Sequence, residues 1–139
     1  MRRTCIIIAT ILGLAMAANG LVMLAVPLDW YFAVPGVTST GAFNQHFIRD
    51  IGMIFVLTGG AYVTGAFRAE TRLLLWTMAT VWFSGHALFH LWEIAVGICS
   101  PSAFPRDFVA VTLPAIIGIG LTAWSYADSR QRLSERRIN

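Results

Sequence analysis

Three titratable residues stand on one face of an apolar segment in the second half of the chain. The segment reads HALFHLWE over residues 86–93 and contains His86, His90 and Glu93. Their spacing of i, i+4 and i+7 places all three side chains on the same side of a helix. Imidazole and carboxylate groups bind transition metals and also transfer protons. The segment therefore predicts one wall of a polar site in apolar surroundings.

A second polar group occurs earlier in the chain. His46 and Asp50 are four residues apart, and Arg49 precedes Asp50. With a helical rise of about 1.5 Å per residue, Asp50 and Glu93 both lie about 10 Å from the centres of their helices. Charged groups in a membrane helix face inward rather than toward lipid. We therefore expect this group to form the opposite wall of the same pocket.

Two kinds of chemistry fit such a pocket. The first is a site for one transition-metal ion (zinc, iron, manganese or copper), whose predicted ligands are His46, Asp50, His86, His90 and Glu93. Haem fits less well, because His86 and His90 share one helix and cannot bind the iron from opposite sides.

The second kind of chemistry needs no metal. Glu93 and Asp50 are then the candidate catalytic residues, acting with the histidines as general acid and base on a small lipid-like ligand. The residues predicted to hold that ligand or a cofactor are Asn19, Arg49 and Trp92. Asn19 falls at about the depth of His90 by the same helical count.

A purely structural interpretation remains open beside these two. Polar side chains between membrane helices also hold the helices in register. In that case Arg49 pairs with Glu93, and the chain is a non-enzymatic subunit that forms a homo-oligomer or joins a larger membrane complex.

The composition indicates where these residues lie. Hydrophobic residues make up 57% of the 139 residues and charged residues 12%, about half the charge of a typical soluble domain. The basic residues are all arginine and flank the apolar segments, where they set membrane topology. We therefore predict a lipid-embedded protein and exclude nucleic acid as a partner.

Four apolar segments are long enough to cross a bilayer as helices. They run over residues 4–26, 47–67, 73–99 and 108–127. Arginines cluster at the N-terminus, in the 68–72 turn and after residue 129, so both termini are predicted to be cytoplasmic. The sequence predicts one all-α transmembrane domain, a four-helix bundle, with the long 27–45 segment as an outer lid.

Local features add detail to this plan. Arg2, Arg3 and an apolar run resemble a secretory signal, but the run continues to Val26 and favours an uncleaved helix.

Small residues recur every four positions in three segments, which predicts close contacts between helices. They are Ala9, Gly13 and Ala17, then Ala61 and Gly65, and then Gly118 and Thr122. Pro114 predicts a kink in the fourth segment. Cys5 and Cys99 lie near opposite faces, too far apart for a disulfide.

A similar four-residue motif occurs at the start of the second segment and just before the fourth. Residues 47–50 read FIRD and residues 104–107 read FPRD, so each segment begins with an Arg-Asp pair. Asp107 suits the start of a helix, where the helix dipole favours negative charge. Asp50 is followed at once by apolar residues and is expected to lie deeper.

The four-segment plan, the FIRD sequence and the histidine-rich third segment resemble small membrane proteins of the DoxX-like superfamily. The resemblance covers the whole chain in topology. It implies a four-helix bundle in a bacterial inner membrane, and it assigns no catalytic residue to this chain.

Overall fold

The computed structural model describes residues 1–138, and its regular elements are all helical. The long helices are α1 (Arg2–Ala25), α3 (Gln45–Phe67), α4 (Arg72–Ala95) and α6 (Leu113–Ile138). Between them lie α2 (Pro27–Ala33), the short 3-10 helix η1 (Val37–Ser39), α5 (Ala103–Asp107) and the π-helical turn η2 (Phe108–Thr112). The predicted all-α class is confirmed.

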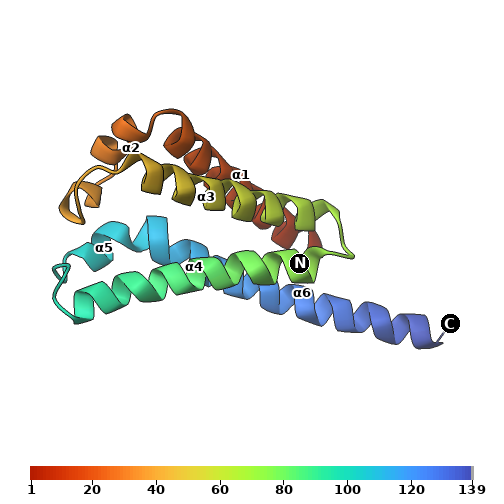
Figure 1. Ribbon diagram of the computed structural model, residues 1–139. Helices are drawn as coiled ribbons and strands as arrows, with labels where there is room; N and C mark the ends of the chain where they lie inside the picture. The colour runs from red at the N-terminus through yellow and green to blue at the C-terminus, as the bar shows by residue number, and fades with distance from the viewer. Residues whose placement is uncertain (139) are drawn as a thin grey trace.

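The long helices pack mainly as two pairs. Helix α1 lies along α3, helix α4 lies along α6, and α3 joins the pairs through its contact with α4 (Figure 1). The N-terminus, the turn between α3 and α4, and the C-terminal part of α6 lie at one end of the molecule. Helices α2 and α5 lie at the other end (Figure 1), which we call the α2–α5 end.

Within residues 1–138, three helical stretches are long and apolar enough to cross a membrane. They are Arg2–Ala25, Gln45–Phe67 and the continuous stretch Ala103–Glu135. The predicted third span, residues 73–99, corresponds to α4, which ends at Ala95. Helix α4 falls outside this set, and its two histidines are among the residues that lower its hydropathy.

Gly97 explains why α4 ends before the predicted boundary. It adopts the left-handed conformation, with φ of 81°, which ends many helices because glycine has no Cβ to clash. The backbone N–H groups of Ile98 and Cys99 both donate to the carbonyl of Glu93, at 2.9 and 3.1 Å. Glu93 therefore lies in the last turn of α4 rather than within a longer helix.

The 27–45 segment is folded rather than extended. Pro27 starts α2 at the first helical position, where its missing N–H costs nothing. The Tyr31 hydroxyl donates to the Gly41 carbonyl at 2.7 Å and ties the end of the segment back to α2. The predicted outer loop is thus an ordered cap formed by α2 and η1.

The contact between α1 and α3 depends on glycines. A Cβ on Gly13 would lie 2.7 Å from the Gly59 carbonyl oxygen, and one on Gly20 would lie 2.5 Å from the Gly52 oxygen. Both distances are shorter than real Cβ contacts, so the two backbones touch directly. The close contact predicted from the Ala9, Gly13 and Ala17 repeat is confirmed.

Large side chains fill the space between α3, α4 and α6. Tyr62 and Trp76 are fully buried, and the Tyr62 hydroxyl lies 2.9 Å from the Thr80 hydroxyl. Thr80 in turn lies 2.9 Å from the Thr122 hydroxyl on α6. Gly118 faces this row, and a side chain there would collide with the Tyr62 hydroxyl. The hydroxyls of Tyr62 and Thr80 are thus satisfied in a buried position, and the half-buried Thr122 extends the row on α6.

The fourth predicted span is irregular at its start. The π-helical turn η2 occupies residues 108–112 and is followed directly by Leu113 and Pro114. Proline has no N–H to donate and its ring disturbs the preceding turn. Extra residues in a π turn relieve such a clash and often mark functional positions. The disturbance expected at Pro114 thus lies in the turn that faces α4.

Candidate functional site

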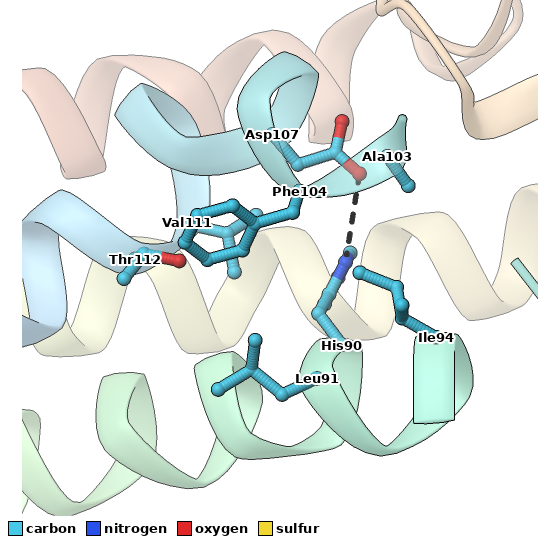
Figure 2. Close-up of a pocket in the computed structure, with 8 residues that line it drawn as sticks. All are labelled: His90, Leu91, Ile94, Ala103, Phe104, Asp107, Val111 and Thr112. Carbon is cyan, nitrogen blue, oxygen red and sulfur yellow. Dashed lines mark ion pairs between the residues drawn. The ribbon is translucent and has the colours of Figure 1, made fainter. Parts of the chain in front are cut away.

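The carboxylate that meets His90 is Asp107. The Nδ1 atom of His90 on α4 lies 3.8 Å from Oδ2 of Asp107 at the end of α5 (Figure 2). The two side chains are only 27% and 18% exposed. An imidazole and a carboxylate from separate helices therefore converge at the α2–α5 end.

Arg106 fixes the orientation of that carboxylate. Its Nε donates to Oδ1 of Asp107 at 2.6 Å, and its Nη2 donates to Oδ2 at 2.8 Å. Such a bidentate ion pair is stronger and more directional than a single hydrogen bond. The side chains of Arg106, Asp107 and His90 form a polar row from the surface toward α4.

A small pocket lies beside this pair. Its volume is about 10 Å³, close to the space that one water molecule needs. Figure 2 shows the lining residues, which are His90, Leu91, Ile94, Ala103, Phe104, Asp107, Val111 and Thr112. Leu91 and Phe104 are 41% and 43% exposed, so the polar pair lies at the edge of an apolar surface.

His86 continues the polar row along α4, as its spacing predicts. Its ring meets the His90 ring edge to face, with 4.7 Å between the centroids, and stacks on Trp82 at 6.2 Å. The Trp82 Nε1 is buried and has no hydrogen-bond partner. The row therefore holds an unused donor, an uncommon feature in a packed interior.

The predicted opposite wall does not join this site. Nε2 of His46 lies 3.3 Å from Oδ2 of Asp50, but the two side chains are 87% and 46% exposed. Arg49 donates through Nε to the Leu24 carbonyl at 3.1 Å, so it binds the end of α1 rather than Glu93. The pair is local to α3, because both residues lie in its first two turns and their side chains are largely exposed.

The remaining predicted residues have other surroundings. The Asn19 side-chain oxygen accepts a hydrogen bond from Nε1 of Trp30 at 3.0 Å, which ties α1 to α2. Trp92 stacks on Phe89 and is 51% exposed. Within residues 1–135, no hydrogen bond or ion pair reaches the side chain of Glu93, which is half-buried.

The predicted metal ligands do not form a shell. In the described part of the chain, no group of three or more His, Cys, Asp or Glu residues is placed to hold a metal ion. His86 and His90 are adjacent, whereas His46 and Asp50 pair with each other. A site for one metal ion therefore stays a prediction of the sequence, with no assembled ligand set in its support.

The sequence analysis did not identify Asp107 and Arg106 as candidate functional residues. Spacing along the sequence predicts for Asp107 only a role at a helix start, because a contact between two helices cannot be counted along one of them. The signal that could have identified it was the repeated Arg-Asp pair of residues 49–50 and 106–107. The second copy, and not the first, meets the histidine row.

Comparisons with known proteins give no match: no protein family model, no curated protein and no solved structure is similar to this chain.

Proposed function

We propose that this chain is a small multi-pass protein of a bacterial inner membrane that binds a small lipid-like ligand beside His90 and Asp107. The observation that carries the proposal is the contact between these two side chains at the edge of an apolar surface. A polar pair of this kind binds the polar end of an amphipathic molecule. The exposed Leu91 and Phe104 offer contacts to its apolar part.

The proposal includes the topology. Helix α4 would be the fourth span, since it is as long as α1 and packs between α3 and α6. Both termini would be cytoplasmic, because the arginine-rich 68–72 turn lies at their end of the molecule. The α2–α5 end, with the ligand site, would then face outward. The DoxX-like resemblance agrees with this plan and remains part of the proposal.

The topology can be tested with the thiols Cys5 and Cys99, which are both free. In a Cys5→Ser background, a membrane-impermeant maleimide should label Cys99 in intact cells, because the loop after α4 would face outward. In a Cys5→Ser, Cys99→Ser background, Ser134→Cys should be labelled only after the cells are permeabilised. The reverse labelling pattern would contradict the proposed orientation.

The ligand can be sought by purification. The wild-type protein, extracted in mild detergent, should carry a bound amphipathic molecule that mass spectrometry identifies. His90→Ala and Asp107→Asn should each lower its amount about tenfold, the loss expected for one charge-assisted hydrogen bond. The matched control is His46→Ala, which removes a histidine from the exposed pair with Asp50. Equal amounts in all four proteins would refute the proposal.

The same contact supports acid–base chemistry. A carboxylate orients an imidazole and stabilises its protonated form, which lets the imidazole accept and return a proton. The bound ligand would then be a substrate, and its reacting group would lie within hydrogen-bond distance of His90.

A second candidate function is that of a non-enzymatic subunit, either in a homo-oligomer or in a larger complex. It is favoured by glycines on open helix faces, since nothing lies within 4 Å of a Cβ built at Gly60, Gly85 or Gly120. Small residues on a lipid-facing surface let another helix approach closely. This function predicts that Gly85→Leu disrupts association and leaves the co-purified ligand unchanged.

A further inference from the structure

A larger cleft lies on the other side of the Arg106–Asp107 pair. Its volume is about 280 Å³, and it is lined by Ser39, Ile98, Cys99, Ser100, Ala103 and Arg106. This volume is many times the space that one water molecule needs. Ala103 lines both this cleft and the pocket beside His90. The two cavities are thus neighbours, with the ion pair between them.

The guanidinium group of Arg106 has N–H donors in this cleft that are not hydrogen-bonded to the protein. Its Nε and Nη2 atoms donate to Asp107, whereas no hydrogen bond in the described chain uses Nη1. The guanidinium group carries five N–H donors in a fixed plane. With one edge occupied by a carboxylate, the remaining donors are available to a second acceptor. Ser39 and Ser100 add hydroxyl groups around the same space.

The outer segment holds Arg106 in place. Gly36 has a φ of 87°, and a side chain there would collide with the guanidinium group of Arg106. The backbone of the segment before η1 therefore lies directly on Arg106. Because η1 includes Ser39, the same contact brings that hydroxyl to the cleft. The cap and α5 thus form the two sides of a preorganised site.

We propose that the cleft binds the oxyanion head, a phosphate or carboxylate, of the lipid-like ligand. This inference rests on the proposed function and adds the chemical class of its ligand. The head accepts hydrogen bonds from Arg106 and from the Ser100 hydroxyl, whereas the Ser39 hydroxyl donates to the Gly36 carbonyl at 2.6 Å and only lines the cleft. Beyond Ala103, the apolar part lies over Phe104 and Leu91. Planar guanidinium groups favour such anions because their donors match two oxygens at once.

The test uses native mass spectrometry of the full-length protein in a neutral detergent. The probes are phosphatidic acid, a diacylglycerol with the same acyl chains, and inorganic phosphate. Wild-type protein should bind phosphatidic acid at least about tenfold more tightly than diacylglycerol. Arg106→Gln should abolish that preference, because the amide keeps the polarity but loses the charge.

Three further variants separate an effect of the cleft from an effect of overall charge or misfolding. Ser39→Asp places a carboxylate in the cleft without changing Arg106, and it should also abolish the preference. Thr40→Asp adds the same charge one residue further along, on an exposed position outside the cleft lining, and should keep it. Arg49→Gln removes the arginine that binds the Leu24 carbonyl and should likewise keep the preference.

The outcomes separate this inference from the proposed function. If the wild-type protein binds the two lipids equally, and His90→Ala loses binding of both, the ligand is lipid-like but has no oxyanion head in the cleft. Binding of inorganic phosphate alone, sensitive to Ser39→Asp, would retain the anion site, assign free phosphate as its source and refute the lipid-like ligand. An unchanged lipid preference in both Arg106→Gln and Ser39→Asp would overturn the cleft as its location.

Discussion

Gly59→Ala is expected to destabilise the folded protein by about 2–3 kcal/mol, although it adds only one methyl group. The Cβ would lie 2.5 Å from the Gly13 carbonyl oxygen and 2.6 Å from the backbone nitrogen of Ala17. Both neighbours are backbone atoms of α1, so neither can move aside by changing a rotamer. The helices must separate, and the separation weakens the packing along the whole α1–α3 contact.

The matched control is the next residue. Gly60→Ala has nothing within 4 Å of its new Cβ, and alanine favours helix by up to about 1 kcal/mol over glycine. The control should therefore be neutral or slightly stabilising. Reversible unfolding in mixed micelles of rising SDS fraction, followed by circular dichroism, measures both changes. Equal stability of the two variants would show that α1 and α3 do not touch at Gly59.

The sequence predicted the helices well because their signals are local. Apolar length and flanking arginines indicate where a membrane helix starts and ends without reference to other helices. The α1 and α3 boundaries accordingly lie within two residues of the predicted spans 4–26 and 47–67. The prediction was less accurate for the later helices: the left-handed backbone of Gly97 ends α4 four residues before the predicted residue 99, and α6 continues to Ile138, beyond the predicted end at residue 127.

The site was harder to predict because it depends on which helices meet. Counting along α4 correctly placed His86 beside His90. It could not show that α5 and η2, rather than the start of α3, face His90. Depth counting selected Asp50 as the partner, whereas the irregular start of the fourth segment brings Asp107 to His90 instead. Glu93, whose partner was uncertain, has none among residues 1–135.

Substitution of Arg72 by leucine is expected to cost about 3 kcal/mol of stability. Arg72 is only 2% exposed at the start of α4, and its Nε and NH2 donate to the carbonyls of Gly65 and Ala66 at 2.8 and 3.1 Å. These carbonyls lie in the last turn of α3, where the helix itself supplies no partner. Leucine would leave both without a donor in a buried position.

The guanidinium group also joins α4 to α6. It lies 5.5 Å from the ring centroids of both Trp76 and Trp124, and its NH1 atom lies 3.6 Å from Oδ2 of Asp128. Asp128 also pairs with Arg132, so loss of Arg72 does not leave the Asp128 carboxylate without a positively charged partner. The expected cost therefore comes from the α3 carbonyls and the lost tryptophan contacts, and it exceeds that of an exposed ion pair.

Arg68→Leu is the control, because Arg68 lies exposed on the same turn; it should change stability by no more than about 0.5 kcal/mol. Arg72→Lys should fall between the two, since lysine keeps the charge but cannot bond both carbonyls in one plane. Unfolding in SDS mixed micelles ranks the three variants. If Arg72→Leu is as stable as Arg68→Leu, the α3 carbonyls are satisfied by another group and Arg72 is not the residue that joins α3, α4 and α6.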